Sequence, residues 1–226
     1  MPEGINYFPL VLSFKVATAA ILIVTPPALA LVYLQARRRY FLRPLVDAVI
    51  LLPMVLPPSV VGFFLVMAMG RQGPIGRWLE GIFDLRIIFS PFAAVIAAAV
   101  VALPILVKTA QPAIESVPLE LEEVGRSLGL RSWTLFFRVI LPAAWRGILA
   151  AIALAYARAL GEFGATLMFA GNIPGRTNTM PLEIFSAYQA GDDGRALFYV
   201  LCLTAFSLLV VILSSRFSPR PRGQST

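Results

Sequence analysis

The sequence contains no histidine and only one cysteine, Cys202, among its 226 residues. A single cysteine excludes a disulfide within the chain, and the lack of histidine removes the side chain that most often binds metals or shuttles protons near neutral pH. The phosphate-binding pattern G-x-x-x-x-G-K-[ST] is also missing, so we expect no nucleotide site in this chain. These absences argue against an enzyme.

Charged residues are scarce: they make up 14% of the chain, whereas hydrophobic residues make up 58%. This composition is too apolar for an ordinary soluble domain of this length and indicates a protein of the lipid bilayer. The net charge of +7 does not indicate a nucleic-acid partner, because the basic residues are scattered through short loops and do not form one basic face.

Apolar runs of roughly 20 residues, each long enough to cross a bilayer as a helix, recur along the chain. They predict an all-α, polytopic membrane protein with one transmembrane domain over residues 1–226. Five spans are expected, at about residues 9–34, 44–69, 87–107, 143–170 and 196–213. The first run is too long, and too poor in preceding basic residues, for a cleaved signal peptide. Short helices are expected in the loops 70–86 and 171–195, and a sixth short or re-entrant membrane helix in the second loop stays open.

Prolines recur inside the apolar runs, where each removes a backbone donor and bends or interrupts a helix. These residues are Pro26, Pro27, Pro53, Pro57, Pro58 and Pro104. We therefore expect bent helices, which suit a bundle that encloses a gap.

Lysine and arginine are distributed unevenly between the loops, and cytoplasmic loops carry the excess of these residues. Twelve lie on one side of the five spans: Arg37, Arg38, Arg39, Arg43, Lys108, Arg126, Arg131, Arg138, Arg146, Arg216, Arg220 and Arg222. Five lie on the other side: Arg71, Arg77, Arg86, Arg176 and Arg195. The asymmetry predicts an external amino terminus, a cytoplasmic carboxyl terminus and a cytoplasmic loop at about residues 108–142 of a cell inner membrane protein.

The 108–142 loop interrupts the apolar pattern with helix signals of its own. Pro118 followed by Glu120 suits a helix start, because proline fits the first turn and acids favour the positive end of the helix dipole. Gly129 is placed to end this helix in a left-handed conformation, Ser132 to cap a second helix and Pro142 to close it. The first helix places on one face Leu121, Val124 and Leu128. The second carries an apolar stripe at helical spacing: Trp133, Phe136, Phe137 and Ile140.

Periodicity alone leaves other interpretations of this helix pair open. It also fits an interfacial loop that lies on the lipid headgroups. A DNA-binding helix-turn-helix fits less well, because the second helix is aromatic where a helix that contacts bases is polar.

The spacing of the loop resembles the EAA motif of ABC-importer permeases, roughly E-A-A-x3-G-x9-I-x-L-P. The matching residues are Glu123, Val124, Gly125, Gly129, Val139, Leu141 and Pro142. Val124 and Gly125 replace the two alanines, and Val139 replaces isoleucine. The resemblance implies a type I ABC importer permease fold, in which this loop couples the membrane helices to a cytoplasmic ATPase. It also implies that the partner ATPase dimer binds ATP and magnesium, so that this chain holds no cofactor and has no catalytic site.

Residues 157–189 resemble the corresponding segment of molybdate permeases, with "GEFGAT" at 161–166, "NIPG" at 172–175 and a following T-x-T-x-P-L-x-I. The first piece is shared with sulfate, thiosulfate and tungstate permeases, whereas the second leans toward molybdate. Candidate pathway residues are Arg158, Gly161, Glu162, Gly164 and Thr166. Close helix packing is the alternative role for the two glycines, and a structural ion pair is the alternative for Arg158 and Glu162, which lie four residues apart.

The resemblance implies a molybdate importer: two copies of this chain form the pathway, an ABC ATPase dimer lies on the cytoplasmic side, and an external binding protein delivers the anion. The few charges within the spans argue against a tight anion site there, and weak contacts let an anion leave. The alternatives are a sulfate, thiosulfate or tungstate permease and, from another class, an ATP-independent channel.

Overall fold

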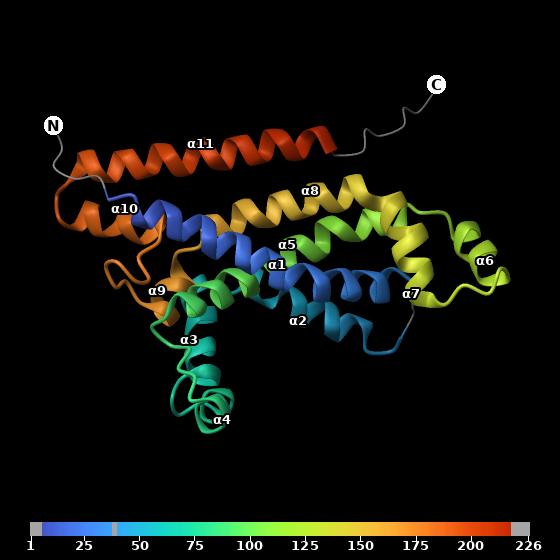
Figure 1. Cartoon of the computed structure of the whole chain (residues 1–226), viewed down its shortest axis with the longest axis horizontal. Coiled ribbons are helices and arrows are strands. Elements are labelled where there is room, and N and C mark those ends of the chain that lie inside the picture. The colour runs from blue at the N-terminus through green and yellow to red at the C-terminus, as the bar shows by residue number, and fades with distance from the viewer. Residues whose placement is uncertain (1–5, 38–39, 218–226) are drawn as a thin grey trace.

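A computed structural model of the chain describes residues 6–37 and 40–217. Four long helices lie side by side along the long axis of the molecule (Figure 1): α1 (Phe8–Arg37), α5 (Pro91–Glu115), α8 (Leu141–Leu160) and α11 (Asp193–Phe217). The described residues contain helices and no strand, which confirms the all-α prediction. Four of the predicted basic loop residues, Arg38, Arg39, Arg220 and Arg222, lie outside the described residues.

The predicted second span is broken in two. The chain bends by 114° between helices α2 (Arg43–Val55) and α3 (Pro58–Met69). Pro57 and Pro58 lie at the break, where the missing backbone donors and the extended conformation of Pro57 stop helix α2 from continuing. Counting this bent pair as one span, the described residues hold up to five candidate membrane spans, against four continuous ones. The expectation of an interrupted helix is confirmed here, whereas Pro26, Pro27 and Pro104 remain inside helices.

The predicted fourth span, 143–170, is wrong at both ends. The helix starts earlier, with α7 (Ser132–Leu135) and a π-helical turn (Phe136–Ile140) that lead directly into α8, so Pro142 does not close a helix. The π turn ends at Ile140, two residues before this proline, and the backbone N–H of Leu141 donates to the oxygen of Phe136 across it. At the other end the helix stops at Gly161, and a separate short helix, α9 (Gly164–Ala170), follows.

Both loops that were expected to hold short helices do so. They are α4 (Pro74–Phe83) in the loop 70–86 and α10 (Met180–Gln189) in the loop 171–195. Helix α10 has ten residues, about 15 Å by its rise, and is therefore too short to be a sixth full span. It packs against α1 and α11 with its first residues buried.

The core lies between α1, α5 and α8, where small side chains let the helices approach closely. Helix α5 buries many alanines, and a Cβ atom on Gly147 of α8 would clash with the Cβ atom of Ala113. Helix α11 is different, because only 6% of an apolar 18-residue stretch within it is buried. Its exposed apolar side chains fit a hydrocarbon environment.

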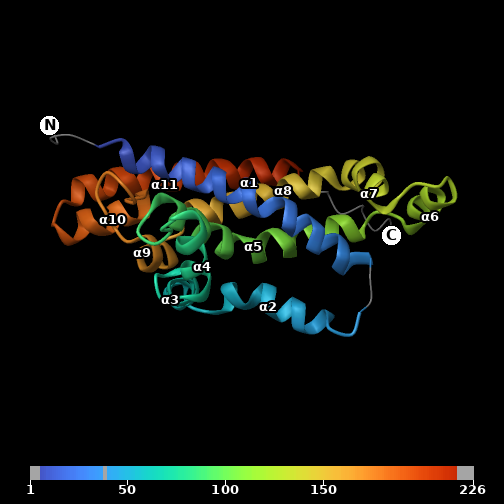
Figure 2. The same cartoon turned by 60° about the horizontal axis from the view of Figure 1, so that its bottom comes forward.

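The loop helices gather at opposite ends of this bundle. Helix α6 (Leu119–Ser127) projects from one end beside α7, whereas α9 and α10 lie at the other end, near the start of α1 (Figures 1 and 2). Helix α4 lies on the same half as α9, below α3 in the first view. The loops that carry the larger and the smaller basic charge are thus separated in space.

Candidate functional site

The turn between α6 and α7 is built around Gly129. Its φ of +77° is the left-handed conformation expected for a glycine after a helix, and the N–H of Leu130 donates to the oxygen of Gly125 to close the turn. Among the described residues, apart from Gly129 and its two chain neighbours, no atom lies within 4 Å of the position that a Cβ atom would take on Gly129, so the need for glycine is conformational and not steric. The predicted cap is wrong, because Ser132 is the first residue of α7 and Arg131 holds the cap position without a side-chain hydrogen bond.

Helix α6 is fastened to the bundle by a buried ion pair that links it to the end of α1. The Nε atom of Arg37 lies 2.5 Å from an oxygen of Glu122, and both side chains are less than a tenth exposed. Arg37 Nη2 also donates to the backbone oxygen of Ile114, in the last turn of α5, at 3.0 Å and to that of Val117, just past α5, at 2.7 Å. Sequence reasoning treated Arg37 as a topology marker only, because nothing in the local pattern pairs residues so far apart.

The outer face of the loop exposes a row of large apolar side chains. They are Leu121, Val124, Leu128, Trp133 and Phe137. The rings of Trp133 and Phe137, both after the turn, stack with their centroids 5.9 Å apart. A monomeric protein rarely leaves so many large apolar side chains of one loop in water, so this loop has the character of a binding surface.

The predicted stripe of the second helix is divided between two faces. Trp133 and Phe137 are exposed, but Phe136 and Ile140 are buried, and the Phe136 ring packs 5.2 Å from that of Tyr33. The π turn changes the helical periodicity, so residues that would share a face of a regular α-helix do not.

The remaining residues of the EAA-like pattern lie along this segment in different environments. Glu123 is exposed, whereas Gly125 is buried against α7, where an added Cβ would lie 3.0 Å from Leu135 Cδ1. Val139 and Leu141 are half-buried, and Pro142 is exposed. The pattern therefore combines packing positions with positions that remain free for contact.

The break between α8 and α9 is organised by one carboxylate. Glu162 is 3% exposed; its Oε2 atom lies 2.8 Å from Nη1 of Arg158, and its Oε1 atom accepts the N–H of Ala165 at 2.8 Å. The predicted contact between Arg158 and Glu162 is confirmed, but Glu162 lies in the break and not within a continuous helix. It joins the last turn of α8 to the first turn of α9.

The two interrupted spans meet at this point. A Cβ atom on Gly164 would lie 2.9 Å from that of Pro58, and one on Gly62 would lie 2.7 Å from that of Met168. Close packing therefore accounts for Gly164, whereas Gly161 has only the oxygen of Ala157 nearby, at 3.7 Å. Thr166, on the same short helix, is 1% exposed.

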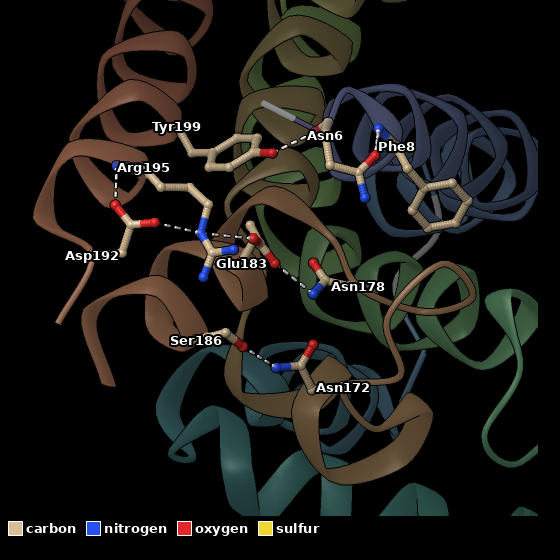
Figure 3. Close-up of polar contacts among 9 residues, drawn as sticks. All are labelled: Asn6, Phe8, Asn172, Asn178, Glu183, Ser186, Asp192, Arg195 and Tyr199. Atoms are coloured by element: carbon tan, nitrogen blue, oxygen red, sulfur yellow. Dashed lines mark hydrogen bonds and ion pairs between the residues drawn. The ribbon is translucent and has the colours of Figure 1, made fainter. Parts of the chain in front are cut away.

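A polar network holds the other end of the bundle together (Figure 3). Glu183 of α10 accepts a hydrogen bond from Asn178 Nδ2 at 2.7 Å and lies 3.4 Å from Nε of Arg195, which also contacts Asp192. Asn172 donates to Ser186 Oγ at 2.6 Å. Sequence reasoning missed this network; the only signal was the density of polar residues in an otherwise apolar half of the chain.

Comparison with known proteins places the chain among transport proteins. Residues 23–223 match the family described as "Binding-protein-dependent transport system inner membrane component". The chain belongs to this family.

Two relatives match almost end to end. The chain is 40% identical to the "Molybdenum transport system permease protein ModB" of Haemophilus influenzae, over 92% of each chain. It is 39% identical to the "Putative molybdenum transport system permease protein YvgM" of Bacillus subtilis, over 93% of this chain and 95% of that one. A solved ABC transporter for the import of alginate has a similar fold: its chain superposes with a TM-score of 0.70 at 13% identity, over 96% of this chain and 81% of that one.

Proposed function

We propose that this chain is the membrane-spanning permease subunit of an ATP-driven importer for molybdate. The observation that carries the proposal is the protruding loop, in which a left-handed glycine joins two helices that present an apolar face and carry the EAA-like residues. The similarity to molybdenum transport permeases over nine-tenths of the chain supports molybdate as the cargo.

The assembly that fits this function contains two copies of the chain, which together form the pathway, with an ABC ATPase dimer on the cytoplasmic side. An external protein binds molybdate and delivers it. ATP and magnesium belong to the ATPase subunits, because the sequence has no phosphate-binding loop.

The loop is suited to pass on a rigid-body movement. Glu122 ties α6 to Arg37, and Arg37 donates to the backbone oxygens of Ile114 in α5 and Val117 just after it, so a displacement of α6 is carried to two long helices, α1 and α5. The exposed apolar row is free to enter a groove of the ATPase at the same time. A flexible loop would absorb the movement that this arrangement transmits.

The pathway passes the interrupted helices in this proposal, near Arg158, Gly161, Glu162, Gly164 and Thr166. Broken membrane helices place irregular backbone where it lines a cavity or is buried in protein. Because Glu162 offsets the charge of Arg158, an anion that passes here is not trapped by an unpaired arginine.

We infer an external amino terminus and a cytoplasmic carboxyl terminus, so that the end with α6 faces the cytoplasm. Reporter fusions after Ser132 should then give a cytoplasmic signal and a fusion after Gly76 an external one. A cytoplasmic signal at Gly76 contradicts this orientation.

Anion competition tests the cargo. Uptake of labelled molybdate by cells that depend on this permease should fall with excess unlabelled molybdate and change little with equimolar sulfate. Equal competition by sulfate, thiosulfate or tungstate would assign the permease to another oxyanion. Co-purification with an ABC ATPase separates the importer from an ATP-independent channel, which leaves the protruding loop without a partner.

A further inference from the structure

A cavity of about 820 Å³ lies between the end of α3, the loop before α4, the loop before α5 and the loop after α9. Its polar lining consists of Arg71, Gln72, Arg86 and Arg176, together with backbone of the glycines at 70 and 73. No acidic side chain lines it within the described part of the chain. The three arginines come from three different segments, so the fold, and not local sequence, brings their charge together.

Two of these arginines lack an ion-pair partner in the part of the chain that the structure describes. Within residues 6–37 and 40–217, neither Arg71 nor Arg176 forms an ion pair. Arg86 contacts Glu80 through Nε at 2.8 Å, which leaves its terminal nitrogens for another partner. The lining thus carries an excess of positive charge in a family member whose spans hold few charges.

The loop that presents Arg176 is held rigidly. Thr177 Oγ1 donates to the oxygen of Gly171 at 2.9 Å and accepts the N–H of Ile173 at 3.0 Å, while Gly175 takes a φ of +70°. Little ordering of this loop is needed when a ligand binds, which lowers the cost of binding.

Another lining residue, Phe89, is constrained as well. Phe89 has a φ of +58°, a conformation that a bulky side chain rarely adopts, and its N–H donates to the oxygen of Phe169 at 3.3 Å. Its ring lies where a side chain on Gly171 would be, 2.9 Å from such a Cβ atom. Backbone strain of this kind persists where the surroundings enforce it, and it gathers at ligand sites.

We propose that Arg71, Arg86 and Arg176 form an outer receiving site for a divalent tetrahedral oxyanion, ahead of the pathway through the spans. Guanidinium groups suit this ligand because each presents several N–H donors in a fixed plane to the oxygens of one anion. A hollow lined by arginines accommodates a small anion better than the convex surface of a protein.

The exposure of Arg71 and Arg176 makes anion binding at this site weak and transient, as transfer to the pathway requires. Its role in transport rests on the proposed function; its affinity for anions does not.

Chemical modification tests the site without transport. In a Cys202→Ala background, Gln72→Cys places a thiol in the cavity lining of the purified full-length protein. An anionic methanethiosulfonate should react faster than a cationic one, and sodium molybdate or sulfate, at constant ionic strength, should slow the reaction.

Adding Arg71→Gln and Arg176→Gln should lower the ratio of anionic to cationic rates by about tenfold. Arg77→Gln is the matched control, since Arg77 lies on exposed α4 outside the cavity, and it should leave the ratio unchanged. The proposal is wrong if neither the added anions nor the Arg71→Gln and Arg176→Gln substitutions change the rates of thiol modification.

Uptake with the loaded binding protein then separates an anion site from a protein-docking surface. At equal amounts of assembled complex, the double variant should lower the maximum uptake rate by about tenfold, with the half-saturating concentration of binding protein unchanged. A raised half-saturating concentration with an unchanged maximum rate identifies a docking surface and overturns the anion site. If the wild-type protein imports no oxyanion, the proposed function fails, and the modification experiment still decides whether the cavity holds an anion.

Discussion

Two adjacent acids of α6 lie in opposite environments. Glu122 is buried in an ion pair with Arg37, and Glu123, the acid of the EAA-like pattern, is exposed. One residue therefore fixes the position of the helix, while its neighbour is free to contact a partner. A linear motif does not reveal this division, because both residues are glutamates in the same turn.

The buried acid should matter most for stability. Glu122→Gln leaves the Arg37 charge buried without a carboxylate, which should destabilise the protein by about 3 kcal/mol. Thermal unfolding of the purified protein in detergent measures the effect. Glu120→Gln is the control, because Glu120 is exposed in the same helix. A similar loss in both variants would show that general charge on α6, and not the buried pair, stabilises the fold.

The Arg158–Glu162 pair allows a second comparison. Glu162→Gln keeps an oxygen to accept the Ala165 N–H but removes the charge that faces Arg158. If the pair lines the pathway, this change should slow anion release while the amount of assembled complex stays the same, and adding Arg158→Gln should restore part of the uptake. Loss of assembled complex in proportion to lost uptake, in both single variants and in the double one, would show a structural role instead.

At the scale of elements, the interrupted spans form a unit in which α3 packs against α9. The contact requires a glycine at position 62, because a Cβ atom there would lie 2.9 Å from the Cα atom and from the backbone oxygen of Ala165. Backbone atoms do not move aside as a flexible side chain does.

Gly62→Ala should therefore destabilise the protein by about 1–3 kcal/mol through overpacking. Gly81→Ala is the matched control, since no described atom outside the neighbouring backbone of helix α4 and the adjacent residues lies within 4 Å of its Cβ position. Thermal unfolding distinguishes them, and equal melting of the two variants would mean that α3 and α9 separate easily.

The turn between α6 and α7 needs glycine for a different reason. It has space for a side chain at Gly129, but its left-handed backbone conformation excludes most side chains. Gly129→Val should insert normally yet strongly reduce ATP-driven uptake and ATPase binding, because a β-branched residue in a left-handed conformation costs about 1–2 kcal/mol. Gly129→Asn is the control, since asparagine tolerates this conformation. Normal uptake by the valine variant would show that the joint is not needed for coupling.

At the scale of the whole molecule, the membrane helices and the two short helices joined at Gly129 were predictable from the sequence. The length of a hydrophobic run and the position of a glycine are local properties of the sequence. The contact of Arg158 with Glu162 was predictable for the same reason. The end of α8 at Gly161 was not, because the apolar run resumes directly after Glu162 and the break removes only a few residues from it. Nor was the pairing of Arg37 with Glu122, or the convergence of three arginines on one cavity, since both arise from packing between distant segments.

The arrangement of the whole molecule agrees with coupling between the loop that carries α6 and the half of the bundle that carries α3 and α4. The loop with the apolar row lies at one end of the long helices, and the arginine-lined cavity lies with α3 and α4 toward the other half (Figure 1). The interrupted spans give the bundle short segments, α2, α3 and α9, beside its long helices.

Transport by purified components tests this account most directly. Lipid vesicles are prepared with the permease and its ATPase, with ATP enclosed and with molybdate-loaded binding protein outside. Molybdate should accumulate inside above its external free concentration, and only with hydrolysable ATP and the binding protein. Uptake that proceeds without ATP and stops at equal concentrations would contradict the account, because it is the behaviour of a channel.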